Sequence, residues 1–172
     1  MFAAVEENPE IPIAVHLDHG NSLATVKEAI SIGFSSVMID GSLMEDGKTP
    51  SDYAYNVGVT KSVVEYAHQF GVTVEAEIGR LGGIEDGVGS GSIHLTDPKE
   101  AQKFVQETGV DALAIAIGTS HGAYKFKGSK ELAFDVLKEV RSLIDIPIVL
   151  HGASSVPQEL IDAVNKYGGK MP

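Results

Sequence analysis

The sequence predicts an α/β fold in which a parallel sheet is covered by helices. Five short apolar runs rich in β-branched residues alternate with segments of helical periodicity along the 172 residues. The apolar runs show little polar alternation, which is typical of strands that are buried on both faces. Polar side chains gather where these runs end, as expected where parallel strands present their carboxyl ends to an active site.

The elements follow one another as five strand-then-helix units. Strands are predicted over residues 11–18, 35–40, 72–78, 112–118 and 146–152. Helices are predicted over residues 23–33, 54–71, 97–109, 131–143 and 157–169. This alternation predicts parallel strands joined by helical crossovers.

Local signals mark several helix ends. The first two helices are predicted to stop at Gly33 and Gly71. Asp97 is placed to cap the third helix, with Pro98 at its first helical position. Ser155 is a candidate cap for the last helix. The segment before the first strand, "MFAAVEENP", is typical of the tail of a helix.

Two architectures fit five such units: a doubly wound open sheet and a (β/α)8 barrel. No G-x-G-x-x-G segment follows the first strand, and the glycine-rich loop 79–92 leads into more loop rather than into a helix. A complete barrel usually needs about 250 residues. The sequence therefore predicts part of a barrel, as a single domain over residues 1–172.

The composition excludes several classes of protein. A net charge of −11 argues against binding to nucleic acid or to an anionic membrane surface. No apolar run approaches the roughly 18 residues needed to span a bilayer, and the N-terminal residues lack signal-peptide features. These features predict a cytoplasmic protein. Cysteine is absent, which excludes disulfides and cysteine zinc sites.

Polar side chains cluster at the carboxyl end of every predicted strand. In chain order they are His16, Asp18 and His19, then Asp40, then Glu75 and Glu77, then His121, and finally His151. Because the carboxyl ends of parallel strands share one edge of a sheet, we expect these side chains to meet there. This convergence favours an active site.

Three of the histidines predict a metal site. His19, His121 and His151 would approach one another at the shared edge. Three imidazoles with an open fourth position form a common catalytic zinc site. His16 is expected either to point into the barrel interior or to support a ligand.

The carboxylates allow more than one interpretation. Asp18 could orient a histidine ligand or donate a proton. Asp40 and Glu77 are candidates for a second metal position or for a hydrogen-bond network. Glu75 shares a strand face with Glu77 and is consistent with a salt-bridge partner. Glu85, in the glycine-rich loop, is either a base that swings into the site or a solvated acid.

Small residues beside the histidines suggest an anion site. Gly122 and Gly152 each follow a candidate ligand, where a missing side chain lets a ligand approach the backbone closely. The run Gly152, Ala153 and Ser154 shortly precedes a helix and is typical of a backbone nest for phosphate. Lys125 is near enough in sequence to join it.

Two absences narrow the chemistry. No lysine lies within a predicted strand, which disfavours a Schiff-base mechanism. No G-x-S-x-G segment is present. The sequence therefore points to metal chemistry.

Four motifs carry a resemblance to a known family. The segments "HLDHG", "VEAEIGRLGGIEDG", "AIGTSHGAYK" and "VLHGAS" resemble the class II, zinc-dependent fructose-bisphosphate aldolases, of which tagatose-bisphosphate aldolase is a near relative. The motifs occur in order, and the resemblance covers nearly the whole chain. Members of the family continue beyond both ends of this sequence, with a further strand that carries an Asn-x-Asp-Thr phosphate segment. The resemblance therefore predicts that this chain is a central fragment of such an aldolase.

The resemblance implies a role for each candidate residue. Zn²⁺ would be the catalytic metal, with a second divalent metal position and room for a monovalent cation. Asp18 would be the proton donor, and Glu85 would handle the C3 proton of dihydroxyacetone phosphate. The remaining implied roles are zinc ligands at His19, His121 and His151, second-metal ligands at Asp40 and Glu77, and phosphate contacts at Gly122, Gly152, Ala153 and Ser154.

The implied reaction is the reversible cleavage of fructose 1,6-bisphosphate into dihydroxyacetone phosphate and glyceraldehyde 3-phosphate, a step of glycolysis and gluconeogenesis. The full-length enzyme would be a homodimer or homotetramer acting on sugar phosphates. Three alternatives remain: a tagatose-bisphosphate aldolase, a non-catalytic zinc-binding remnant, and a metal-dependent hydrolase. The hydrolase is disfavoured because such enzymes usually carry a His-x-His pair, whereas this chain has His16 and His19 three positions apart.

Overall fold

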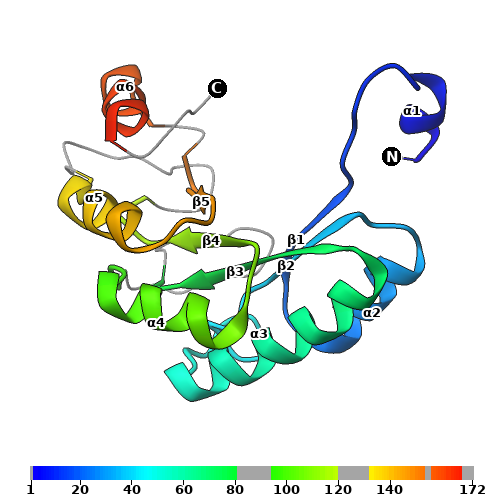
Figure 1. The fold of residues 1–172 in the computed structure, drawn as a ribbon, viewed down its shortest axis with the longest axis horizontal. Helices are drawn as coiled ribbons and strands as arrows, with labels where there is room; N and C mark the ends of the chain where they lie inside the picture. Colours follow the sequence, from blue (N-terminus) through cyan, green and yellow to red (C-terminus); the bar gives the residue numbers. More distant parts are fainter. Residues whose placement is uncertain (1, 81–93, 120–131, 154–155, 168–172) are drawn as a thin grey trace.

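The computed structural model describes residues 2–80, 94–119, 132–153 and 156–167 (Figure 1). At its centre is a parallel sheet in which the order of the strands, β1-β2-β3-β4-β5, follows the chain. The strands are β1 (His16–Gly20), β2 (Ser36–Ile39), β3 (Thr73–Ile78), β4 (Ala112–Ile115) and β5 (Ile148–Val149). In a doubly wound sheet the order of the strands reverses at a switch point, whereas in a barrel each strand lies beside the preceding one. The sequential order therefore selects the barrel architecture.

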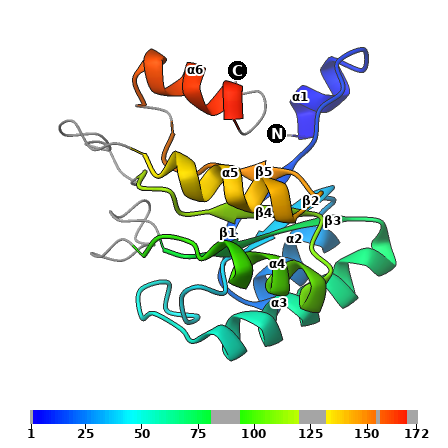
Figure 2. The ribbon, with the colours of Figure 1, turned by 60° about the vertical axis from the view of Figure 1, so that its left-hand side comes forward.

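Helices alternate with the strands. They are α1 (Phe2–Glu7), α2 (Leu23–Ser31), α3 (Tyr53–Ala67), the 3₁₀ helix η1 (His68–Phe70), α4 (Pro98–Thr108), α5 (Phe134–Leu143) and α6 (Gln158–Tyr167). From α2 to α6, each long helix contacts the next, and Figures 1 and 2 show them following the outer side of the curved sheet. Among the described residues, none of these helices has the length and apolar character needed to cross a bilayer.

The two faces of the sheet differ in polarity. The face under the helices is apolar, and it packs buried side chains such as Val37 and Val74 into a core with Phe104 of α4. The opposite face carries Glu75 and Glu77, because alternate residues of a strand point to opposite faces. Polar side chains on an otherwise buried strand therefore mark the face that holds the candidate site.

Three strand predictions were too long, and one of them is the fourth strand, predicted over 112–118, which ends at Ile115. The prediction of a strand over residues 11–18 is wrong before His16, since Pro12 has no N–H to give to a ladder and Ile11 and Ile13 are 51% and 42% exposed. The fifth strand, predicted over 146–152, is confined to the two residues of β5. Apolar composition extended these predictions beyond the residues that pair with a neighbouring strand.

Several of the residues predicted to begin or end a helix do so in the structure. The side chain of Asp97 accepts hydrogen bonds from the backbone N–H groups of the second and third residues of α4, at 2.8 and 3.0 Å. Gly71, with φ of 68°, ends η1. The helix predicted over 54–71 is divided into α3, which ends at Ala67, and the 3₁₀ helix η1, which begins at His68. Helix α1 confirms the helical character of the first residues, and Ser155 lies outside the described residues.

Candidate functional site

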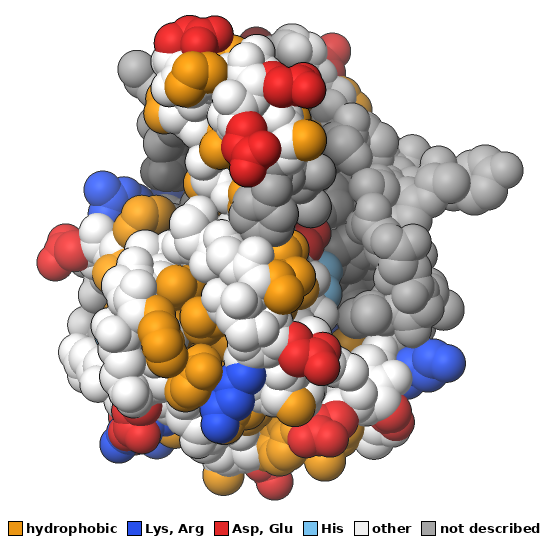
Figure 3. Space-filling model, turned by 90° about the vertical axis from the view of Figure 1, so that its right-hand side faces the viewer, with side chains coloured by type: hydrophobic (Ala, Val, Ile, Leu, Met, Phe, Trp, Pro, Cys, Tyr) orange, Lys and Arg blue, Asp and Glu red, His pale blue; other side chains and the backbone are white. Residues whose placement is uncertain are grey.

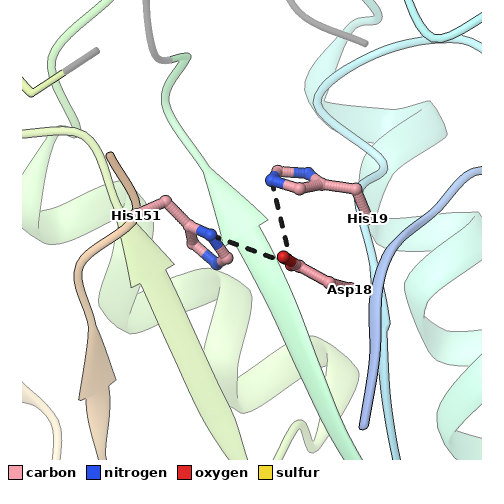
Figure 4. Close-up of side chains that lie close together, drawn as sticks. All are labelled: Asp18, His19 and His151. Atoms are coloured by element: carbon pink, nitrogen blue, oxygen red, sulfur yellow. Dashed lines mark ion pairs between the residues drawn. The ribbon is translucent and has the colours of Figure 1, made fainter. Parts of the chain in front are cut away.

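The polar side chains at the carboxyl ends of the strands lie together on the face away from the helices. Asp18, His19 and His151 point toward one another in Figure 4, although more than 130 residues separate the first from the last. In the space-filling view, a histidine surface is visible in a hollow on one side of the molecule (Figure 3). The sheet therefore brings together His19 and His151, two of the three histidines that were predicted to meet.

Asp18 and His19 are consecutive in β1, yet both side chains reach the site. In a regular strand, consecutive side chains point to opposite faces. Between Leu17 and Gly20 the register of β1 against β2 shifts by one residue, so β1 carries one extra residue there. Within this irregular stretch His19 has a φ of 46°, which is uncommon for residues other than glycine. The irregularity is what places both side chains on the same side.

His19 is anchored by a buried carboxylate. Its Nδ1 lies 3.2 Å from Oδ2 of Asp40, which is only 6% exposed. The other oxygen of Asp40 accepts hydrogen bonds from the backbone N–H and the hydroxyl of Ser42, at 3.1 and 2.6 Å. The backbone N–H of Asp40 donates to the carbonyl of Gly20 at 2.9 Å. These contacts fix the position and the rotation of the His19 ring.

The pair of His19 and Asp40 favours its charged form. Burial lowers the pKa of His19, but the hydrogen bond to Asp40 and the nearby carboxylate charges outweigh burial, and the pKa is raised overall. Burial raises the pKa of Asp40, but the hydrogen bonds from His19 and Ser42 outweigh it, and the pKa is lowered. A metal ion binding to His19 must therefore compete with a proton.

Asp18 lies between two imidazoles. Its Oδ1 is 3.9 Å from Nε2 of His19 and 3.8 Å from Nδ1 of His151, and Figure 4 shows both ion pairs. The two rings are 4.8 Å apart between centroids. The Asp18 side chain is 64% exposed, so a molecule from solvent can reach it. An exposed carboxyl group between two fixed imidazoles is suited to proton transfer beside a metal.

Two groups of ligand atoms are close enough to share an ion. Asp18, His19 and His151 form one group, and His19, Asp40 and Glu77 form the other. Within each group the ligand atoms lie within 4.8 Å of one another. Imidazole nitrogen and carboxylate oxygen are ligands that zinc and other divalent ions accept in proteins. The residues present therefore fit a divalent metal, and His19 belongs to both positions.

The sequence matches a known family over almost its whole length. The model of the class II fructose-bisphosphate aldolases matches residues 1–170. The chain belongs to this family. The fructose-bisphosphate aldolase of Giardia intestinalis is 58% identical over 172 residues, which cover 99% of this chain and 51% of that protein. The class 2 fructose-bisphosphate aldolase of a Synechocystis strain is 52% identical over 188 residues, covering 100% and 52%.

A solved aldolase structure agrees with the fold. The YdjI aldolase from Escherichia coli K12 superposes with a TM-score of 0.78 at 34% identity, covering 97% of this chain and 55% of that one. The chain spans about half the length of the class II aldolases it matches. The parallel sheet accordingly corresponds to part of the (β/α)8 barrel of this metal-dependent family, as predicted.

The structure places part of the predicted aldolase site. It brings together Asp18, His19, Asp40, Glu77 and His151. Gly152 and Ala153 follow His151 directly, and Gly152 has a φ of 65°. The other predicted site residues lie outside the described residues, and their roles stay predictions: Glu85, His121, Gly122, Lys125 and Ser154.

The glycine-rich loop that carries Glu85 has its two ends joined at this edge. Arg80 and His94 exchange backbone hydrogen bonds of 2.9 Å in each direction. Gly79 has a φ of 88°, and a Cβ there would lie 2.6 Å from Oγ1 of Thr96. The loop therefore starts and ends beside the carboxyl end of β3.

Glu75 is the residue whose importance the sequence understated. It was predicted as a salt-bridge partner, and its Oε1 lies 2.8 Å from Nε2 of His151. Its Oε2 lies 3.8 Å from Nε2 of His16, so His16 contacts the site through Glu75. The available signal was the spacing of Glu75 and Glu77, which places two carboxylates on one face of a central strand.

Proposed function

We propose that this chain forms the metal-binding part of a zinc-dependent fructose-bisphosphate aldolase. The reaction would be the reversible cleavage of fructose 1,6-bisphosphate into dihydroxyacetone phosphate and glyceraldehyde 3-phosphate, in glycolysis and gluconeogenesis. The observation that carries the proposal is the placement of Asp18 within 4 Å of both His19 and His151. The names of the relatives at 52% to 58% identity support the same reaction.

His19 and His151 would hold the zinc ion together with His121. Asp40 and Glu77 would serve a second divalent position through their group with His19. Zinc bound there would supply Lewis acidity toward the ketone oxygen of the substrate. The contacts of Asp40 with Ser42 keep the His19 side of this site in place before the metal arrives.

Asp18 would be the acid and base of the carbon–carbon bond step. In the cleavage direction it takes the proton of the C4 hydroxyl as the C3–C4 bond breaks and the aldehyde forms. In the synthesis direction it returns that proton to the new alkoxide. Glu85 would handle the proton at C3. The exposure of the Asp18 side chain leaves it accessible to the sugar phosphate.

The remaining predicted residues would bind phosphate. Gly122, Gly152, Ala153 and Ser154 would offer backbone N–H groups to the phosphate of dihydroxyacetone phosphate, with Lys125 nearby. The positive φ of Gly152 supports this role, because it turns the backbone directly after His151. A cytoplasmic homodimer or homotetramer is part of the same proposal.

The test is zinc content and turnover of the purified chain, measured with fructose 1,6-bisphosphate and with tagatose 1,6-bisphosphate. We expect zinc-dependent release of triose phosphate that a chelator abolishes. Asp18→Asn should keep its zinc and lose at least about 100-fold in turnover, the contribution typical of a general acid–base group. Turnover that persists after chelation, or that Asp18→Asn leaves intact, would refute the proposal.

A further inference from the structure

Glu75 contacts His151 in a way that decides which ring nitrogen faces the site. The Nε2 of His151 is 2.8 Å from Oε1 of Glu75. An ionised carboxylate can only accept a hydrogen bond, so Nε2 carries the hydrogen. In the neutral ring, Nδ1 is then the nitrogen that carries no hydrogen. That nitrogen is the one 3.8 Å from Asp18, on the side of the His19 ring.

The backbone of Glu75 is held by more strand pairing than the backbone of His151. It lies in β3, which pairs with β2 at Met38 and with β4 at Ala112. His151 follows the two-residue strand β5, and its carbonyl accepts a hydrogen bond of 2.7 Å from the hydroxyl of Thr119. Glu75, on the central strand β3, can therefore hold the side chain of His151, which follows the short strand β5.

The second oxygen of Glu75 faces His16. Its Oε2 lies 3.8 Å from Nε2 of His16, and Nδ1 of His16 lies 2.8 Å from the hydroxyl of Ser36. The Ser36 oxygen in turn accepts a hydrogen bond of 3.0 Å from Thr73. A row of polar side chains thus runs from β1 across β2 to β3 beside the Glu75 carboxylate.

We propose that Glu75 is a positioning residue that holds His151 as the Nε2–H tautomer, with Nδ1 directed at the metal position. The proposal rests on the proposed metal site but not on the aldol reaction. Carboxylates that orient histidine ligands typically contribute about 10- to 100-fold to metal affinity. Glu75 would therefore act on metal binding, through His151, without touching the substrate.

The chain contains a matched control. Nε2 of His68 lies 2.9 Å from Oδ2 of Asp111, a contact of the same kind at the opposite ends of the strands. Asp111→Asn makes the same carboxylate-to-amide change as Glu75→Gln, away from the candidate metal position. It should alter the His68 resonances and leave zinc affinity within threefold of the wild-type value.

The experiment combines two readouts on the full chain. Nitrogen-15 NMR of the histidine rings in the metal-free protein, assigned with His151→Ala, reports the tautomer of His151. Competition with a zinc-binding dye reports the affinity for zinc. We expect the Nε2–H tautomer in the wild type, a weaker preference for it in Glu75→Gln, whose amide oxygen is a poorer acceptor, and its loss in Glu75→Ala. In both variants we expect a zinc affinity lowered about 10- to 100-fold. If Glu75→Ala fails to fold, Glu75→Gln, which is close in size, decides alone.

The outcomes separate this proposal from the proposed function. A wild-type chain that binds zinc, with Glu75→Gln unchanged in tautomer and within threefold in affinity, would overturn the role of Glu75 and leave the aldolase site standing. A hydrogen on Nδ1 of His151, seen by NMR of the metal-free wild type, would overturn the positioning role of Glu75 before any zinc is added. A wild-type chain with the Nε2–H tautomer that binds no zinc would instead refute the metal site and, with it, the positioning role.

Discussion

Two histidine–carboxylate pairs stand at opposite ends of the strands and have almost the same geometry. His151 and Glu75 are 2.8 Å apart at the carboxyl ends, and His68 and Asp111 are 2.9 Å apart at the amino ends. The side chains of the first pair are 13% and 10% exposed, whereas those of the second are 44% and 39% exposed. A histidine–carboxylate contact therefore says little about function until its surroundings are known.

The surroundings differ in what else each carboxylate contacts. Asp111 accepts a further hydrogen bond of 2.7 Å from the backbone N–H of Val74, and it ties β3 to the chain before β4. Glu75 faces a second histidine and reaches Asp18 through His151. At the amino ends of the strands, the His68–Asp111 pair joins structural elements. At the carboxyl ends, the His151–Glu75 pair orients the His151 ring.

The largest difference between the two ends should appear on removal of a histidine. His19→Ala takes a ligand from both groups, so we expect zinc affinity to fall by more than about 100-fold, beyond the effect of losing an orienting carboxylate. His68→Ala should leave zinc affinity unchanged. Dye competition measures both, and equal losses in the two variants would contradict the division between the ends.

Two glycines extend the comparison of the two strand ends to the free energy of unfolding. Gly79, at the carboxyl end of β3, has a φ of 88°, and a Cβ would also lie 2.9 Å from the Cβ of Ala116. Gly109, before β4, has a φ of 71° with its nearest contact at 3.9 Å. Gly79→Ala should lower the free energy of unfolding by about 3 kcal/mol, through strain and overlap. Gly109→Ala should lower it by about 1 kcal/mol, through strain alone. Urea denaturation of both variants tests the order, and a larger loss in Gly109→Ala would contradict it.

Asp111→Ala should act on stability alone. The backbone N–H of Val74 loses an acceptor in a part-buried position, which costs about 1–2 kcal/mol in the free energy of unfolding. Zinc affinity should not change, because the site lies at the other ends of the strands. Urea denaturation and dye competition on one preparation give both numbers. A loss of zinc affinity in the folded variant would show that the two ends are coupled.

The smallest expected effect is a pH dependence confined to the site. The pKa of His19 is raised, so its contribution to stability is full below 6.5 and is lost as pH rises through the raised pKa. The pKa of Asp40 is lowered, so its contribution is present above 3.8 and is lost as pH falls through the lowered pKa. The metal-free chain should gain most from this pair between pH 3.8 and 6.5 and should lose stability as the pH rises through the raised pKa of His19. Urea titrations with a chelator present test this, and His19→Gln should reduce the loss; the same slope in both proteins would contradict the assignment.

The sequence predicted the arrangement of units better than their internal geometry. Alternating apolar and amphipathic segments were enough to place five strands and the helices between them, because burial on both faces leaves a strong pattern. The strand ends were less predictable: Ile11 and Ile13 look like strand residues, but no neighbouring strand pairs with them in the described residues. Pairing depends on the partner strand, which local composition does not contain.

For the candidate site, too, the sequence predicted which side chains meet better than it predicted how they contact one another. Histidines and carboxylates at strand ends predicted which side chains would meet, since parallel topology sends them to one edge. The contact of Glu75 with His151 joins residues 76 positions apart, and no local pattern encodes which ring nitrogen it meets. The shift of register at His19 was equally invisible, since "HLDHG" reads as a regular strand end.

The extra residue in β1 also determines which insertions and deletions the chain can accept. Removing one residue between Leu17 and Gly20 would restore even pairing with β2, so the sheet itself would lose little. Because Asp18 and His19 are the two residues of that stretch, the same deletion would remove either the carboxylate or the imidazole from the site. In this segment the candidate site needs one residue more than the pairing of the sheet does.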